Sequence, residues 1–203
     1  MRRCALALVL IGLAAACSPK GPPGDEKYNE SIEAARQAKD SMLAGAPDSP
    51  VPPDKRSAFL PLSYFPVDPA YAVPASLEET PAGARAQLEM QTSGGEPRRM
   101  ERVGILRFTL NGQRMQLSGF VEAGEPPGRL FVPFADATSG RETYKAGRYL
   151  EIPRSPTGIY TVDFNKAFNP YCYYNPKYDC PFPPRENRLP VAIQAGEKIK
   201  RNE

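Results

Sequence analysis

Two short polar motifs in this sequence hold residues that could carry out chemistry. Asp136 and Thr138 lie in DATSG, and Asp163 and Asn165 lie in DFN, each motif following an apolar run. If the ends of the two runs are neighbours, the two carboxylates could act as acid and base in a hydrolase or bind a hard cation. The same residue types form Asx and ST turns, in which a side chain bonds its own backbone. The sequence leaves both interpretations open.

A third motif, SGRETYKAGRYL, places a phenol and a guanidinium on one predicted strand. Tyr144 and Arg148 are four positions apart, so they lie on the same face of an extended chain. Arg148 could then bind the carboxylate or phosphate of a ligand beside Tyr144. The alternative is an internal ion pair of Arg148 with Asp163 or Glu197.

The segment from residue 163 to residue 190 is rich in proline and tyrosine. Proline fixes φ at about −65° and favours an extended residue before it, so this segment should form a stiff strap. Its tyrosines could stack on a sugar ring or cover the apolar end of a β domain: Tyr171, Tyr173, Tyr174 and Tyr178. We expect the strap to act mainly as a lid that covers the apolar end of the β domain. Asn169 and Asn187 in the strap, and Glu197 beyond it, complete the predicted binding residues.

The composition excludes several kinds of active site. The chain has no histidine, and Ser-His-Asp triads and Cys-His pairs both need an imidazole base. An enzyme built on this sequence would have to use carboxylates, tyrosine, lysine or a bound cation. The sequence identifies no cofactor, and the Gly-rich phosphate loops GxGxxG and GxxxxGK[ST] are both missing.

The N-terminus is typical of an exported protein. Residues 1–16 combine a charged start, an apolar run shorter than the roughly 20 residues that span a bilayer, and small residues before Cys17. The closing LAAAC resembles a bacterial lipoprotein signal, in which the cysteine is lipidated and becomes the first mature residue. An ordinary cleaved signal peptide is the alternative. Ser18 after Cys17 favours, by resemblance to Gram-negative lipoproteins, the outer membrane and a protein that faces the periplasm.

Cysteine usage follows from this export signal. Cys4 leaves with the signal peptide and Cys17 takes the lipid, so Cys172 and Cys180 remain. Two neighbouring cysteines in an oxidising compartment favour a disulfide. They are too few ligands for a structural zinc site, so we predict no metal centre.

The rest of the chain divides by composition. We expect a lipid-anchored tether over residues 17–24 and a helix over 25–45, which packs on its own domain or binds a partner. A proline-rich linker over 46–58 and a β-rich domain over 59–203 follow.

A hairpin is the clearest local signal of that domain. Asn111 and Gly112 suit the two positive φ angles of a type I′ turn, and this turn pairs Phe108 with Met115. Short strands rich in Val, Ile, Phe and Tyr surround the hairpin, and PVAIQAG reads as the last of them. We predict a mainly β fold of the α+β class: a single antiparallel domain, barrel or sandwich-like, with one N-terminal helix.

Two long stretches resemble a known family. FADATSGRETYKAGRYL and DFNKAFNPYCYYNPKYDCPFPPRENRLPVAIQAGEKI together look like the C-terminal signature of the bacterial family called domain of unknown function 1684. The lead-in KDSMLAGAPDSPVPPDKRSAFLPLSYFPVDPAYAVPASLEE is similar to that family as well. The resemblance implies a β-rich domain and brings no established activity or substrate.

Two classes of function remain. The first is a non-enzymatic envelope lipoprotein that binds a small molecule or an envelope protein, held to the membrane through Cys17. The second is a hydrolase that uses Asp136 and Asp163. A nucleic-acid partner is not expected, because removal of the signal peptide lowers the net charge from +3 to +1.

Overall fold

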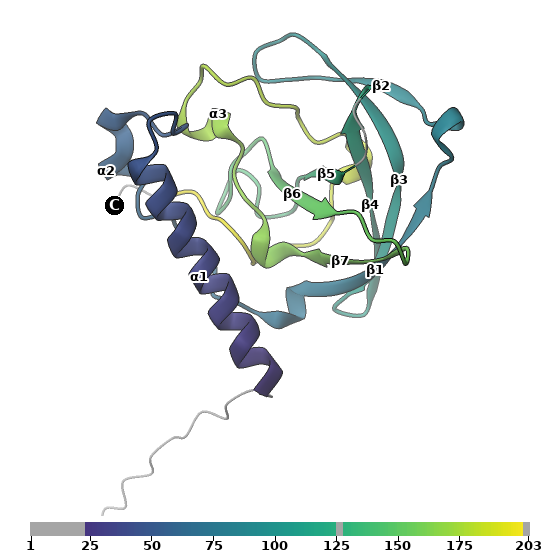
Figure 1. Cartoon of the computed structure of the whole chain (residues 1–203), viewed down its shortest axis with the longest axis horizontal. Coiled ribbons are helices and arrows are strands. Elements are labelled where there is room, and N and C mark those ends of the chain that lie inside the picture. Colours follow the sequence, from purple (N-terminus) through teal and green to yellow (C-terminus); the bar gives the residue numbers. More distant parts are fainter. Residues whose placement is uncertain (1–22, 125–127, 201–203) are drawn as a thin grey trace, which may run out of the picture.

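The computed structural model describes residues 23–124 and 128–200. Over these ranges the chain forms one antiparallel sheet, curled into about half of a barrel, and a long N-terminal helix beside it (Figure 1). This arrangement confirms the predicted mainly β fold with an N-terminal helix. The predicted signal peptide and the lipidation site Cys17 lie outside the described residues.

The sheet places consecutive strands at its two edges. Its order is β6-β5-β4-β3-β1-β7, and β2 pairs with the first part of β3. The outer strands β6 and β7 approach each other, which gives the sheet its curl. The strands are β1 (Ala72–Glu79), β2 (Gln87–Met90), β3 (Arg98–Leu110), β4 (Gln113–Glu122), β5 (Arg129–Phe134), β6 (Arg148–Pro153) and β7 (Ile159–Asp163).

The β3–β4 hairpin has the predicted turn and register. Asn111 and Gly112 have φ angles of 50° and 77°, which are the positive values that a type I′ turn requires. Phe108 pairs with Met115, as expected. The turn residues and the apolar alternation of the two strands specify this pairing together, because a shift of one residue would turn the apolar face to solvent.

The main core lies inside the curl. Every strand except β2 contributes buried side chains to it, and the C-terminal segment adds Ile193 and Ala195. Phe134 and Phe164 meet edge to face at its centre, with ring centroids 5.3 Å apart. Burial of each such ring contributes about 1.5–3 kcal/mol.

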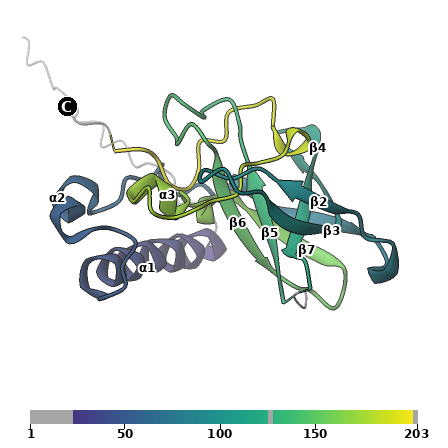
Figure 2. The ribbon, with the colours of Figure 1, turned by 90° about the horizontal axis from the view of Figure 1, so that it is seen from above.

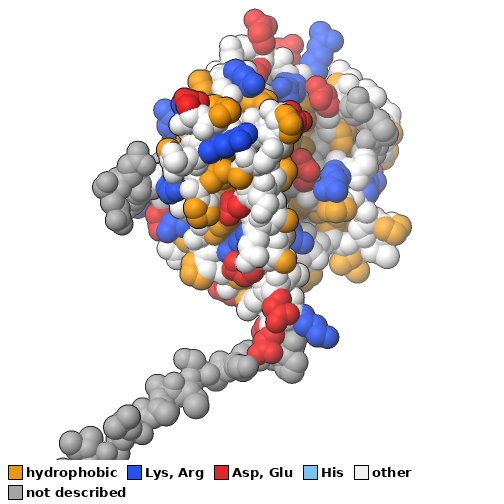
Figure 3. Space-filling view, turned by 60° about the vertical axis from the view of Figure 1, so that its left-hand side comes forward, with side chains coloured by type: hydrophobic (Ala, Val, Ile, Leu, Met, Phe, Trp, Pro, Cys, Tyr) orange, Lys and Arg blue, Asp and Glu red, His pale blue; other side chains and the backbone are white. Residues whose placement is uncertain are grey.

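The helix α1 (Pro23–Gly45) lies along one side of the half-barrel (Figure 2). Ile32 and Leu43 are buried on its inner face. Acidic side chains gather at its first turn, which lies at the lower end of the molecule in Figure 3. Their negative charges interact favourably with the partial positive charge of the helix N-terminus. Leu43 packs with Val51 and Tyr174, so the proline-rich segment after α1 joins a second small core.

Short helices connect the remaining parts. They are η1 (Pro53–Lys55), α2 (Arg56–Phe59), η2 (Pro69–Tyr71), η3 (Ala82–Ala84), η4 (Phe164–Lys166), α3 (Tyr171–Tyr174) and η5 (Arg185–Asn187). No helix in the described ranges is long and apolar enough to cross a membrane.

The expected last strand is absent. PVAIQAG forms an irregular extended segment instead. The carbonyl groups of Ile193 and Ala195 in this segment accept hydrogen bonds from Arg148. The guanidinium of Arg148 thus donates the hydrogen bonds that the backbone amides of a neighbouring strand would otherwise donate to these carbonyls.

Candidate functional site

Asp136, Thr138 and Arg148 form one buried cluster. Nη2 of Arg148 lies 3.0 Å from Oδ2 of Asp136, and the two side chains are 0% and 1% exposed. The amide and hydroxyl of Thr138 both donate to Oδ1 of Asp136, at 2.8 and 2.6 Å. Burial lowers the pKa of Arg148 from its ordinary value, and the charge of Asp136 opposes that shift. Every part of this cluster faces the protein interior.

Asp163 and Asn165 form a second cluster, at the end of β7. The hydroxyl of Tyr28 in α1 donates to Oδ1 of Asp163 at 2.7 Å, and the Asn165 amide donates to the same atom at 3.1 Å. Asn165 in turn donates from Nδ2 to the Asp68 carbonyl at 2.8 Å. Burial first, and then the hydrogen bond to Asp163, raise the pKa of Tyr28 above its ordinary value. The cluster fastens α1 and the η2 turn to β7.

Asp163 also borders a small cavity of about 210 Å³ between β6 and β7. This volume is below the roughly 300 Å³ at which small-molecule sites begin. Among the described residues, no hydrogen bond or ion pair of Asp136 shares a partner with Asp163. The two predicted catalytic carboxylates therefore belong to separate clusters.

Glu197 and Asn169 belong to a third cluster, which joins three distant segments. The Glu197 side chain is 2% exposed. It accepts hydrogen bonds from the Asn169 amide at 2.7 Å, from the Tyr174 hydroxyl at 2.9 Å and from the Lys39 ammonium. Burial first, and then Glu197, raise the pKa of Tyr174 well above its ordinary value. This carboxylate holds α1 and α3 against the C-terminal segment.

Asn187 fills a gap in the sheet. Its Oδ1 accepts from the Ser118 amide at 2.7 Å, and its Nδ2 donates to the carbonyls of Ser118 and Pro133 at 2.9 and 2.7 Å. The side chain thus satisfies backbone groups of β4 and β5 in the way a strand would. Its role in this structure is to join these two strands.

The predicted Cys172–Cys180 disulfide is wrong for this structure, because both residues are free thiols. The Cys172 amide donates to Sγ of Cys180 at 3.2 Å, and a hydrogen bond between the two thiols replaces the covalent bond. That hydrogen bond lowers the pKa of Cys172 to about 6 and raises the pKa of Cys180. Burial, and then Cys172, raise the pKa of Tyr144 to about 12, so Tyr144 accompanies the thiol pair and not Arg148.

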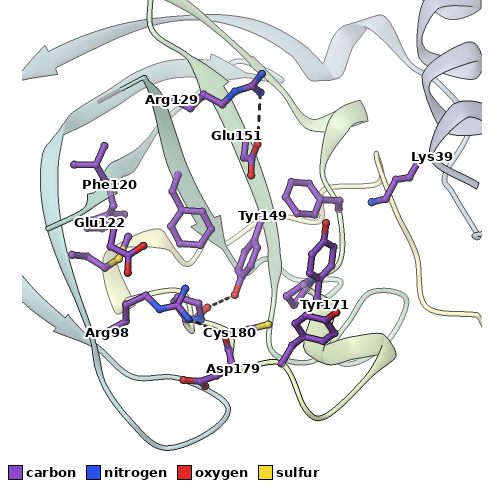
Figure 4. Close-up of a pocket in the computed structure, with 17 residues that line it drawn as sticks. Lys39, Arg98, Phe120, Glu122, Arg129, Tyr149, Glu151, Tyr171, Asp179 and Cys180 are labelled. Carbon is purple, nitrogen blue, oxygen red and sulfur yellow. Dashed lines mark hydrogen bonds and ion pairs between the residues drawn. The ribbon is translucent and has the colours of Figure 1, made fainter. Parts of the chain in front are cut away.

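A cavity of about 730 Å³ lies beside these clusters, between the sheet and the strap (Figure 4). Apart from the strap tyrosines, none of the residues predicted to bind a ligand lines it. Its walls come from α1, β3, β4, β5, β6 and the strap: Lys39, Arg98, Met100, Phe120, Val121, Glu122, Arg129, Phe131, Tyr149, Glu151, Phe168, Pro170, Tyr171, Tyr178, Asp179, Cys180 and Pro181.

Aromatic rings form the walls of this cavity. Tyr149 meets Phe131 and Phe168 edge to face, with centroid distances of 4.7 and 5.9 Å. Tyr171 and Tyr178 of the strap, which also line the cavity, form another edge-to-face pair at 5.4 Å. The Tyr149 hydroxyl donates to the Pro181 carbonyl in the strap, so its ring is fixed in place. Burial raises the pKa of Tyr149, so this residue remains a phenol at neutral pH.

The sequence prediction found part of this cavity. The strap tyrosines Tyr171 and Tyr178 were singled out, and both line it. Phe131 and Tyr149 were missed because each lies on a strand that reads simply as half buried. Period-two alternation places such rings on one face, but which face encloses a cavity depends on how distant strands curl.

In the described ranges no three acidic or cysteine side chains are grouped as metal ligands.

Comparison with known proteins places this half-barrel in a family. Residues 57–198 match the family described as "Protein of unknown function (DUF1684)", and the chain belongs to that family. It is also similar to an uncharacterized protein of Haloarcula marismortui, solved by solution NMR. The two are 35% identical with a TM-score of 0.68, and the match covers 87% of this chain and 96% of the other. None of the curated proteins matches. The helix α1 precedes the family match.

Proposed function

We propose that this protein is a lipid-anchored module of the bacterial cell envelope that binds a small molecule in the 730 Å³ cavity. The cavity itself carries the proposal. Its volume lies within the roughly 300–1,000 Å³ of ligand sites, and its lining combines aromatic rings with a few charged groups, as such sites do. Edge-to-face packing holds the rings in place before a ligand arrives, which lowers the entropic cost of binding.

Binding is favoured over hydrolysis by where the carboxylates lie. Asp136 is bound by Arg148 and Thr138, and Asp163 is bound by Tyr28 and Asn165. A general acid or base must reach its substrate within hydrogen-bond distance. Neither carboxylate lines the large cavity, and both act as turn and helix anchors.

The envelope location rests on the export signal and its LAAAC ending before Cys17. A lipid on Cys17 would hold the protein at the outer membrane, facing the periplasm. The helix α1 begins at residue 23, and its Lys39 lines the cavity. The tether would therefore keep the cavity within a short reach of the bilayer surface.

The test is binding of a neutral apolar probe, N-phenyl-1-naphthylamine, to the lipid-free chain of residues 18–203. This chain retains every residue that the structure describes. We expect saturable binding of one probe per protein, seen as a rise in probe fluorescence. Phe131→Ala and Tyr178→Ala should each weaken it about three- to tenfold, since an aromatic contact contributes about 0.5–1.5 kcal/mol beyond its buried area.

Ile159→Ala is the matched control. Ile159 is 67% exposed on β7 and does not line the large cavity, so this variant should bind as the original chain does. Absence of saturable binding would count against the proposal. So would equal weakening in the control and in the two cavity variants.

A further inference from the structure

Arg98 is a positively charged residue in the wall of the cavity, and most of its hydrogen-bond donors have no partner in the part of the protein that the structure describes. It is the first residue of β3 and is half-buried. Its one side-chain hydrogen bond among the described residues goes from Nη2 to the Asp179 carbonyl, at 3.1 Å. A guanidinium carries five N–H donors in a fixed fork, so most of its donors are left for another acceptor.

The other cations of the cavity already have carboxylate partners. Arg129 lies 3.6 Å from Glu151, and Lys39 is bound to Glu197. Within the described part of the chain, no carboxylate lies within ion-pair distance of Arg98. Arg98 therefore differs from both of them in carrying an unmatched positive charge.

The acidic side chains of the cavity do not cancel this charge at close range. The hydrogen bond between Asp179 and Arg98 is made by the Asp179 backbone carbonyl, while the carboxylate accepts from the Gly94 amide at 2.5 Å and interacts with the Arg98 charge only beyond ion-pair distance. Glu122 also lines the cavity, but it is exposed to solvent at the end of β4. Water screens an exposed carboxylate far more than a half-buried guanidinium.

The Arg98 side chain lies next to the aromatic wall of the cavity (Figure 4). Figure 4 shows the Arg98 side chain directed toward the centre of the cavity, near Tyr149 and Cys180. Tyr149 forms the middle of the aromatic wall, between Phe131 and Phe168. A ligand ring lying against this wall would bring a substituent on its edge to the guanidinium.

We propose that the cavity binds organic anions: a flat apolar body lies against the aromatic wall, and a carboxylate, sulfonate or phosphate group binds Arg98. This inference rests on the ligand-binding function proposed above and adds the class of ligand. Guanidinium groups bind such anions through two parallel N–H bonds, a geometry that lysine does not reproduce.

The test compares two probes with the same ring system in the chain of residues 18–203. N-Phenyl-1-naphthylamine is neutral, and 8-anilinonaphthalene-1-sulfonate adds one sulfonate. We expect the anion to bind more tightly, and Arg98→Gln to weaken its binding about tenfold or more while the neutral probe is unaffected. Arg107→Gln is the control, because Arg107 lies on the same strand but pairs with Glu78 outside the cavity.

Two further variants separate charge from structure. Arg98→Lys keeps the charge but loses the two-bond geometry, so its preference for the anion should fall between that of the original chain and that of Arg98→Gln, even if Arg98→Gln lowers the thermal stability. Glu122→Gln removes one of the negative charges in the cavity wall, so it should strengthen sulfonate binding. Weaker sulfonate binding in Glu122→Gln, or an anion preference unchanged in Arg98→Gln, would overturn the inference.

The outcomes also distinguish the two proposals. If both probes bind saturably and equally well, the cavity is a ligand site without preference for anions, and only the inference fails. If neither probe binds, the proposed function fails with it. Sulfonate binding that Arg98→Gln and Arg107→Gln weaken equally would show general attraction to a positive surface and would overturn the role of Arg98.

Discussion

At the scale of single residues, Arg148 and Asp136 form a buried ion pair in which each charge depends on the other, and of the guanidinium nitrogens only Nε has no hydrogen-bond partner among the described residues. Three backbone carbonyls and one carboxylate surround the guanidinium, and the two side chains are 0% and 1% exposed. A buried charge whose partner is removed costs about 3–5 kcal/mol, far more than the pair contributes in net terms.

We therefore predict that Asp136→Asn destabilises the protein by about 3–5 kcal/mol. The substituted amide is neutral, and its NH₂ group would face the guanidinium, so Arg148 would remain buried without its ion-pair partner. Urea unfolding followed by circular dichroism measures the change. Glu78→Gln is the control: Glu78 pairs with Arg107 at the surface, so its loss should cost less than about 1 kcal/mol. Equal stability of Asp136→Asn and the original chain would refute this account.

The thiol of Cys172 should be unusually reactive for a half-buried cysteine. Its pKa is about 6, because Cys180 donates a hydrogen bond that favours the thiolate. In the chain of residues 18–203, alkylation of Cys172 by iodoacetamide should rise with pH around 6 and level off by neutral pH. Cys180→Ala removes the donor, so the midpoint should move up toward the ordinary value of about 8.5. A midpoint near 8.5 in the original chain would contradict the hydrogen-bonded pair.

The sequence could name these polar residues but not their partners. DATSG and DFN were open to two interpretations, catalytic carboxylates or Asx turns. In the structure Asp136 and Asp163 each accept from the amide two residues ahead, as such turns do. The remaining acceptor positions are filled by Arg148, Tyr28 and other groups far along the chain, and no local rule predicts such contacts.

At the scale of elements, the predictable parts are those that depend on local chemistry. The Asn111-Gly112 turn determines a whole hairpin, and a helical period predicts α1. The placing of β1 between β3 and β7 could not be predicted, since β6 and β7 are consecutive in the sequence and yet form opposite edges of the sheet. The cavity results from that order and the curl, so it could not be predicted either.

Gly147 holds the strap against β5 at the point where β6 begins. Its φ is +91°, and a Cβ atom there would lie 2.5 Å from the Phe134 carbonyl oxygen and 2.7 Å from Cγ of Pro183. Contacts this short require the backbone itself to move. The absence of a side chain at this position is therefore what allows the strap to approach the sheet.

We predict that Gly147→Ala lowers the melting temperature much more than Gly158→Ala does. Gly158 has a similar φ of +73°, but a Cβ atom there would meet open space. Gly158→Ala should therefore cost only the conformational strain of about 1 kcal/mol, equivalent to about 2–4 °C in a protein of this size. Gly147→Ala adds the clash to that strain, and a shift at least twice as large is expected in thermal unfolding. Equal shifts would show that the strap is free to move away.

At the scale of the whole molecule, α1 connects the predicted anchor to the folded body. It lies outside the family match, yet Tyr28, Ile32, Lys39 and Leu43 all contact the domain that follows. A helix fixed in this way holds the body in one orientation relative to its first turn. The proposed lipid on Cys17 would then position the cavity near the bilayer.

The lipid on Cys17 is the step of this proposal that a single labelling experiment can test. Each buried CH₂ contributes about 0.8 kcal/mol, and one acyl chain binds membranes only marginally, so stable anchoring needs a multiply acylated cysteine. We expect cells fed an alkyne fatty acid to label the full-length protein, and the label to resist an alkaline wash of the membranes. Cys4→Ser should keep the label, because Cys4 lies within the predicted signal peptide, and Cys17→Ser should lose it. An unlabelled original protein, released to the periplasm, would instead show that the signal is an ordinary cleaved one and that the cavity works away from the membrane.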